Sequence, residues 1–323
     1  MIVSRSQNQF SQHRENSASL LWRFFLYQKE RFPLLGHGLL VAAFSFSAVS
    51  YSRICRGATG FIDWPTFSVG IFTTISLFFL VRVFDEFKDA EEDARYRPEL
   101  PVPRGLVSLR ELAVAGTVLS VLLMGLNLYF FPKMLSILGI IMGYLLFMGK
   151  EFFVARWLKS HQFWYVTSHM FIIPFIDVYA SGLDWLLAGV SPPTGLLFFF
   201  AVSYMNGIVL EIGRKIRVPA AETAGVLTYS AMLGTNRATG LWIVLLFLTL
   251  VFSMTAALAA GYERVELTVL AALFVLCTAP AFLFLTYKRK TYAKMIEYAS
   301  AIWTVGMYLT LGGGPMLAKL FME

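Results

Sequence analysis

Charged residues are scarce in this sequence. Of its 323 residues, only 15% are Asp, Glu, Lys or Arg, whereas 57% are hydrophobic, and the mean hydropathy is +0.65. Soluble domains carry about 25% charged residues, so this composition excludes an ordinary soluble protein, a coiled coil and a disordered interaction protein. The sequence therefore predicts an integral membrane protein.

Cysteine is almost absent. The two residues, Cys55 and Cys277, lie far apart and are expected to be unpaired. This excludes a secreted scaffold held together by disulfide bonds, and it gives no indication of a zinc site. The net charge of +7 does not indicate nucleic acid, because basic residues beside apolar segments are explained by membrane topology. We predict membrane lipids as partners, with no nucleic acid and no protein partner.

Long apolar runs make up most of the chain. A helix that crosses the hydrocarbon core needs about 20 mostly apolar residues. Short segments rich in Pro, Gly or charge separate these runs, as expected for turns between neighbouring helices. We predict an all-α membrane protein with nine transmembrane helices, at residues 34–51, 67–84, 109–131, 134–152, 163–182, 195–210, 241–261, 267–287 and 296–320.

Basic residues fall mainly on one side of these nine helices. Cytoplasmic loops are enriched in Lys and Arg, so we predict a cytoplasmic N-terminus and a C-terminus on the opposite side. Residues 1–33 are predicted to be a cytoplasmic tail with an amphipathic surface helix at 20–31, and residues 34–323 a single transmembrane domain. With this orientation, five of the 27 Lys and Arg residues lie outside: Arg53, Arg56, Lys133, Arg264 and Lys319.

The densest acidic cluster, residues 85–93, follows the second predicted helix. If that helix continues, Asp85, Asp89 and Asp93 stand four residues apart and share one face. Carboxylates stacked in this way repel one another unless a cation lies among them, and such hard oxygen ligands suit Mg²⁺ together with phosphate oxygens. The cluster predicts a site for a phosphorylated substrate at the membrane surface. The alternative is an ordinary solvated loop.

A second charged cluster follows the sixth predicted helix, where Glu211 precedes Arg214, Lys215 and Arg217. Arginine can bind a phosphate through two parallel hydrogen bonds, and lysine acts as a point charge. One carboxylate with three cations therefore suits direct binding of a diphosphate better than a metal site with two acidic ligands. The alternative is plain anchoring by positive charge on the inner side.

Three polar residues fall inside predicted helices: His169, Asp177 and Asn206. His169 and Asp177 are eight residues apart and share a helix face. Such groups at membrane depth indicate a function, although pairing with a neighbouring helix is equally common. We consider them candidates for lining a substrate chamber, or alternatively for a transport site near the middle of the membrane.

The motifs resemble those of a known family. Residues 85–93, followed by the Pro-Val-Pro-Arg-Gly turn at 101–105, are similar to the first aspartate-rich motif and the next turn of the UbiA superfamily of intramembrane prenyltransferases. Residues 225–230 resemble the stretch after the second acidic motif of that family. The resemblance implies a nine-helix bundle around a central cavity with a cytoplasmic cap of loops. It also implies Mg²⁺, a prenyl diphosphate and a lipid-soluble acceptor.

The resemblance also assigns roles to residues, with two departures from the family pattern. Leu100 replaces the usual Arg of the turn, and Lys215 stands where the second acid of the second motif is expected. The implied catalytic residues are Asp85, Asp89, Asp93 and Glu211, which with Glu86 are the implied metal ligands. The implied diphosphate-binding residues are Lys88, Arg104, Lys150, Arg214, Lys215 and Arg217.

These observations predict an intramembrane, Mg²⁺-dependent enzyme that ionises a prenyl diphosphate and transfers the prenyl group to an aromatic or other lipid acceptor. Two alternatives stay open. One is a terpene cyclase of the same superfamily, in which the prenyl cation is attacked by its own double bonds. The other is a small transporter or ion permease that uses the polar residues inside the helices. Convergence of Asp85, Asp89 and Glu211 on one place favours the enzyme.

Overall fold

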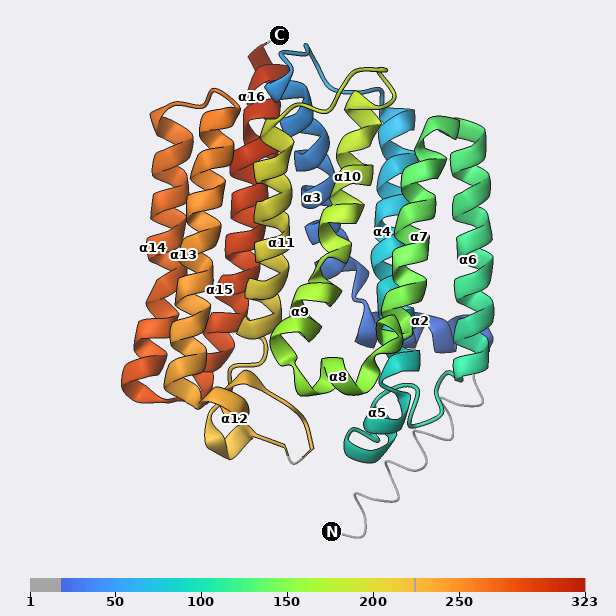
Figure 1. Cartoon of the computed structure of the whole chain (residues 1–323), viewed down its shortest axis with the longest axis vertical. Helices are drawn as coiled ribbons and strands as arrows, with labels where there is room; N and C mark the ends of the chain where they lie inside the picture. Colours follow the sequence, from blue (N-terminus) through green and yellow to red (C-terminus); the bar gives the residue numbers. More distant parts are fainter. Residues whose placement is uncertain (1–18, 224, 323) are drawn as a thin grey trace.

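The structure is a computed structural model and describes residues 19–223 and 225–322; residues 1–18 of the predicted tail lie outside this part. All regular elements among the described residues are helical, which confirms the predicted all-α class (Figure 1). The long helices run side by side as one bundle. In chain order the α-helices are α2 (Leu20–Arg31), α3 (Leu34–Cys55), α4 (Trp64–Lys88), α5 (Ala90–Tyr96), α6 (Leu109–Phe130), α7 (Leu135–Gly149), α8 (Ala155–Ser160), α9 (Gln162–Met170), α10 (Ile172–Trp185), α11 (Gly195–Gly213), α12 (Tyr229–Leu233), α13 (Thr235–Ala259), α14 (Arg264–Tyr287), α15 (Lys290–Tyr308) and α16 (Gly314–Met322).

Eight segments among the described residues are long and apolar enough to cross a membrane, which makes the chain a multi-pass integral membrane protein. The ninth predicted segment, 296–320, is also helical and runs along the bundle as α15, a π-helix at Leu309–Gly313 and α16. The first turns of α15 carry Lys290, Lys294 and Glu297, so this helix does not match the apolar character of the other eight. The count of nine is therefore not confirmed.

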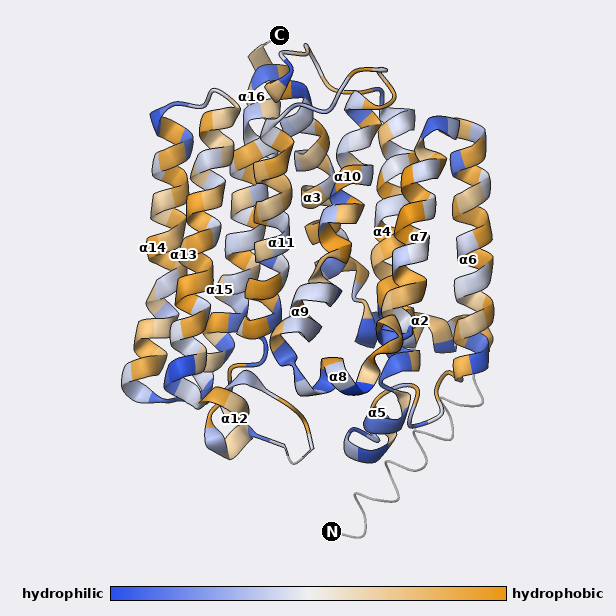
Figure 2. Ribbon diagram, in the orientation of Figure 1, coloured by the Kyte–Doolittle hydropathy of each residue, from blue (hydrophilic) through white to orange (hydrophobic). Residues whose placement is uncertain are grey.

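The polar elements gather at the ends of the bundle, as Figure 2 shows. The short helices α5, α8 and α12 lie at the lower end in Figure 1, where α4 and α11 also finish. We call this the motif end. α2 lies at the same end, in the place predicted for the surface helix, and α16 lies at the opposite end. The orientation of the bundle in the membrane stays a prediction.

Local sequence sets the boundaries of α4 and α6. α4 begins at an Asp63 cap, whose Oδ1 accepts a hydrogen bond from the Thr66 N–H at 2.8 Å, and it ends at Lys88, with Asp89 as its C-cap. α6 begins with a reciprocal pair in which Ser108 and Glu111 cap each other's backbone N–H. Such a capping box fixes where a helix starts. Ser108 is thus the residue that sets the start of α6.

The last helix approaches α3 closely at Gly312, within the π-helix. A Cβ atom on Gly312 would overlap the backbone of Ser47, at 2.7 Å from its Cα. Glycine lets membrane helices pack with their backbones in near contact. Backbone atoms cannot move aside as a flexible side chain can, so this position has no room for a larger residue.

We therefore expect Gly312→Ala to destabilise the protein by about 1–3 kcal/mol, the usual cost of overpacking. Gly139→Ala is the matched control, because a Cβ there meets nothing within 4 Å and alanine stabilises a helix relative to glycine by up to about 1 kcal/mol. Thermal unfolding of the detergent-solubilised variants measures both changes. Equal melting temperatures for the two variants would contradict the close approach of α3 and the π-helix.

Candidate functional site

The last turn of α4 places two carboxylates on either side of a buried cation. The Lys88 Nζ lies 2.9 Å from Asp85 Oδ1 and 4.0 Å from Asp89 Oδ1. It also lies 5.4 Å from the centre of the Tyr165 ring, and its side chain is only 9% exposed. Asp85 and Asp89 therefore share one face, as predicted, and the Lys88 ammonium stabilises two negative charges that would otherwise repel each other.

Of these two acids, Asp89 is the one whose negative charge the protein stabilises less. Burial raises the pKa of Asp89 to about 6, against the opposing effect of Lys88, and the nearby carboxylates of Asp85 and Asp93 raise it as well. A divalent cation bound beside this carboxylate would favour its charged form. A bound metal ion would thus offset the cost of burying the charge of Asp89.

Glu86 and Asp93 are paired with arginines rather than with Lys88. Glu86 Oε1 accepts hydrogen bonds from Arg31 Nε at 2.6 Å and from Arg82 Nη2 at 3.0 Å. Asp93 Oδ1 lies 2.5 Å from Arg97 Nη2, and both acids are 2% exposed. The prediction that Asp93 shares a face with Asp85 and Asp89 is wrong, because α4 stops at Lys88 and the chain turns at Asp89 before α5 begins.

The end of α11 brings the second charged cluster opposite the first. Glu211 accepts hydrogen bonds from Arg214, with Nε at 2.7 Å, and its Oε1 lies 2.6 Å from Lys215 Nζ. Arg214 also interacts electrostatically with Asp85 of α4. The Arg214 side chain is 57% exposed, so it has access to a ligand. Cations from α11 thus face carboxylates from α4.

α9 fills the space between the two clusters. The rings of Tyr165 and His169 stack with their centres 4.2 Å apart, and His169 interacts electrostatically with Lys88, Asp85 and Glu211. Among the described residues, nothing hydrogen-bonds His169 Nε2, although the side chain is buried. His169 therefore belongs to the same cluster as the two charged motifs.

Loops cover this cluster at the motif end. Gly225 has a φ of +79°, and a Cβ on it would overlap the Tyr96 ring, so the loop after α11 contacts α5 directly. Tyr229 at the start of α12 interacts electrostatically with Glu211, Arg214 and Tyr165. The segments after α4 and after α11 therefore meet across the site, which is the cap of loops that the family resemblance implies.

Other candidates are placed elsewhere. Arg104 binds Glu30 of α2, with Nη2 and Oε1 2.7 Å apart, and Lys150 is exposed at the end of α7. Arg217 follows the cluster, with its backbone N–H donating to Ser230 Oγ at 2.6 Å.

The two candidates inside the bundle are separate from His169. Asp177 on α10 accepts a hydrogen bond from Ser203 Oγ of α11 at 2.5 Å, and its carboxylate is fully buried. Asn206 is 1% exposed, and neither atom of its amide has a hydrogen-bond partner among the described residues. The Asp177–Ser203 hydrogen bond joins neighbouring helices, which is the second use considered above for polar groups at membrane depth.

The donor set at the motif end fits a metal ion that arrives with its substrate. Within residues 19–223 and 225–322, no three His, Cys, Asp or Glu side chains are arranged to hold a metal ion by themselves. Mg²⁺ typically uses one or two protein carboxylates and completes its shell with water and phosphate oxygens. Asp85 and Asp89 supply two carboxylates on one face, and the cations of α11 lie across from them. The residues therefore fit Mg²⁺ bound together with a diphosphate.

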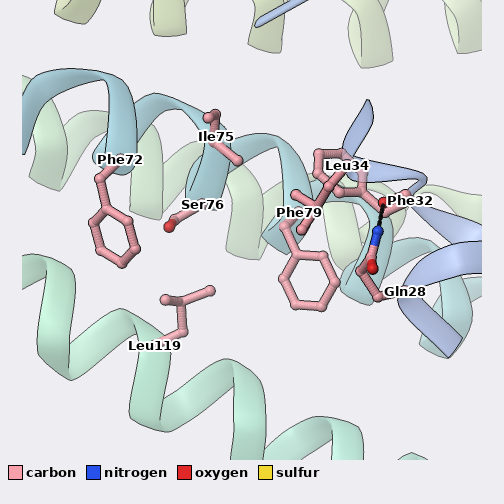
Figure 3. Close-up of a pocket in the computed structure, with 8 residues that line it drawn as sticks. All are labelled: Gln28, Phe32, Leu34, Phe72, Ile75, Ser76, Phe79 and Leu119. Carbon is pink, nitrogen blue, oxygen red and sulfur yellow. Dashed lines mark hydrogen bonds between the residues drawn. The ribbon is translucent and has the colours of Figure 1, made fainter. Parts of the chain in front are cut away.

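An apolar crevice of about 230 Å³ is lined by residues outside the charged clusters (Figure 3). On α4, Phe72 and Phe79 precede Glu86 at intervals of seven residues, so they share the face of Glu86. Neither Asp85 nor Asp89 lines the crevice. It is lined by Gln28, Phe32, Leu34, Phe72, Ile75, Ser76, Phe79 and Leu119.

Comparisons with known proteins identify the fold and the family. The chain resembles a solved structure of digeranylgeranylglyceryl phosphate synthase at 14% identity and a TM-score of 0.58, over 90% of this chain and 98% of that one. It also resembles a UbiA homologue from Archaeoglobus fulgidus, solved with DMAPP and Mg²⁺, at 15% identity and a TM-score of 0.50, over 84% and 97%. No curated protein sequence matches. The model of the UbiA prenyltransferase family matches residues 43–305, most of the chain, which therefore belongs to that family.

Proposed function

We propose that this protein is a Mg²⁺-dependent intramembrane enzyme that ionises a prenyl diphosphate and transfers the prenyl group to a lipid-soluble acceptor. The observation that carries the proposal is the approach of α4 and α11, in which Arg214 interacts with both Glu211 and Asp85. A diphosphate between these helices would meet carboxylate-bound metal on one side and cationic side chains on the other. The Archaeoglobus fulgidus homologue, bound to DMAPP and Mg²⁺, supports this assignment.

The residues at the motif end have different proposed roles in binding the diphosphate. Asp85 and Asp89 would hold Mg²⁺, which when bound offsets negative charge on the leaving group. Arg214 and Lys215 would donate hydrogen bonds to diphosphate oxygens, and such donors stabilise charge that develops as the C–O bond breaks. Lys88 lies between the carboxylates of Asp85 and Asp89. Once Mg²⁺ neutralises these carboxylates, the Lys88 ammonium would be available to bind the diphosphate.

The second motif favours one metal ion rather than two. Glu211 is the carboxylate of this cluster, and it is already paired with both Arg214 and Lys215. A second Mg²⁺ there would have to displace two cations from one acid. We therefore propose that the α11 side binds the diphosphate directly, with the prenyl chain between the apolar helices, away from water that would quench the cation.

The arrangement favours an enzyme over a transporter. His169 lies with Lys88 in the charged cluster, whereas Asp177 is held by Ser203. A transporter typically gathers its binding groups near the middle of the membrane. Here Asp85 and Glu211 converge at one end of the bundle instead.

The test is diphosphate release by the purified protein in detergent, with C10, C15 and C20 prenyl diphosphates and extraction of products for mass spectrometry. We expect release that requires Mg²⁺ and an aromatic or other lipid acceptor, with EDTA already saturated with Mg²⁺ as the control for chelator effects. Release without an acceptor, giving a cyclic product, would assign the protein to the cyclase branch. Release that is unchanged by EDTA, or no release with any donor, would refute the proposal.

The proposal also predicts a pH dependence of the metal requirement. Asp89 has a pKa of about 6, and a protonated carboxyl does not bind Mg²⁺. As pH falls below about 6, the Mg²⁺ concentration for half-maximal release should therefore rise by about tenfold per pH unit, because one proton competes with the metal. Above that pH, the requirement should level off. Mg²⁺ titrations between pH 5 and pH 8 measure this, and a flat requirement would exclude Asp89 as a ligand.

A further inference from the structure

The surface helix α2 is attached to the first acidic motif, although it precedes the residues 43–305 that match the family model. Its Arg31 side chain is 11% exposed and donates from Nε to Glu86 Oε1 at 2.6 Å. The same guanidinium lies 3.6 Å, through Nη2, from Asp93 Oδ2. The Tyr27 hydroxyl lies 3.4 Å from Glu86 Oε1 as well. One helix outside the motif therefore contacts two of its acids, Glu86 and Asp93.

The contact of Arg31 with Glu86 and Asp93 joins two different helices. Glu86 lies in the last turn of α4 and Asp93 lies in α5, so they stand on opposite sides of the break at Asp89. A single guanidinium bound to both fixes the angle between α4 and α5. That angle sets where Asp89 points, because Asp89 is the residue at the junction.

We propose that Arg31 is a positioning residue for the metal site: by binding Glu86 and Asp93 together, it fixes the turn at Asp89 and directs the Asp85 and Asp89 carboxylates toward Mg²⁺ and the diphosphate. This inference rests on the proposed function. Groups that orient metal ligands without touching the metal are worth about 10–100-fold in metal affinity. Arginine suits this role because its planar fork can bind two carboxylates at once.

α2 has other attachments that do not involve the acidic motif. Arg23 Nη2 lies 2.5 Å from Glu111 Oε1, and Arg23 Nη1 donates to the Leu106 carbonyl oxygen at 3.1 Å. Tyr27 is fully buried in a small apolar cluster with Val83 and Leu106. Loss of Arg31 should therefore leave α2 docked. Arg23 offers a matched control, since it is a second α2 arginine that pairs with an acid of α6 instead of the motif.

The experiment compares Arg31→Met, Arg31→Lys and Arg23→Met with the parent protein. The primary readout is the rise in melting temperature produced by geranyl S-thiolodiphosphate, which resists ionisation, as Mg²⁺ is titrated; diphosphate release from the true substrate is the second. For Arg31→Met we expect the half-saturating Mg²⁺ concentration to rise about 10–100-fold, with the KM for prenyl diphosphate at saturating Mg²⁺ little changed. Arg31→Lys should recover part of the loss, because a point charge can bind one of the two carboxylates.

A general loosening of α2 would give a different pattern. Arg23→Met should keep the parent's Mg²⁺ requirement even if its melting temperature falls. If Arg31→Met and Arg23→Met shift the Mg²⁺ requirement equally, or neither shifts it, the positioning role is refuted while the proposed function stands. If the parent itself shows no Mg²⁺-dependent stabilisation by the analogue and no release, the proposed function fails, and this inference fails with it. Arg31→Lys keeps the test decisive if the methionine variant does not fold.

Discussion

Asp89→Asn is expected to lower kcat/KM for the prenyl diphosphate by about two to three orders of magnitude, the range found when a single charge-stabilising contact to a transition state is removed. Asparagine keeps the size of the side chain and one oxygen but cannot carry the negative charge that Mg²⁺ needs. The raised pKa of Asp89, about 6, means that the protein alone stabilises this charge poorly. The loss should therefore appear in the Mg²⁺ dependence as well as in the rate.

Asp63→Asn is the matched control for this prediction. Asp63 caps the opposite end of the same helix and hydrogen-bonds the Thr66 N–H, and asparagine is an equally good N-cap. The control variant should keep the parent's kinetics and melting temperature. Steady-state release of diphosphate over a Mg²⁺ series measures both variants. Comparable activity in the Asp89 and Asp63 variants would remove Asp89 from the metal site.

Arg214→Gln is expected to lower kcat/KM by about a hundredfold. Its guanidinium is the exposed cation between Glu211 and Asp85, where we place the leaving diphosphate. Glutamine preserves a hydrogen-bond donor but removes the charge and the fork geometry that suit phosphate oxygens. The KM for the diphosphate should rise, and kcat should fall as well, since negative charge grows on the leaving group during ionisation.

Arg237→Gln serves as the control for Arg214. Arg237 is an exposed cation near the start of α13, within the same predicted inner loop region. If basic residues there act only by anchoring the bundle to the membrane surface, both substitutions should have equally small effects. A selective loss for Arg214, measured as kcat and KM with equal amounts of folded protein, supports diphosphate binding. Equal values for the two variants would support anchoring.

The sequence predicted much of the fold because membrane helices have a strong local signature. Apolar runs place the long helices close to their observed bounds, although α13 begins at Thr235 rather than at the predicted residue 241. The last helix was harder to judge, because its charged first turns and its π-helical segment at Leu309–Gly313 depart from a uniform apolar run. In that segment Gly312 lies against the backbone of Ser47, a contact between distant residues that no local pattern shows.

The candidate site was only partly predictable, because some of its contacts join residues that are distant in the sequence. Asp85 and Asp89 are four residues apart, a spacing that predicts that they share one helix face. Asp93 has the same spacing, but the helix breaks at Asp89, and its partner Arg31 comes from a helix that lies about sixty residues earlier in the chain. Ion pairs between distant elements leave no periodic trace. Tyr165 could have been found, because it lies four residues before His169 and so on the same face.

The most direct test of the account is a structure of the protein with Mg²⁺ and geranyl S-thiolodiphosphate. The account predicts a diphosphate at the motif end, with one Mg²⁺ bound by Asp85 and Asp89 and the far oxygens bound by Arg214 and Lys215. Glu86 and Asp93 should keep their contacts with Arg31. A diphosphate bound elsewhere in the bundle, or two metal ions with one held by Glu211, would contradict it.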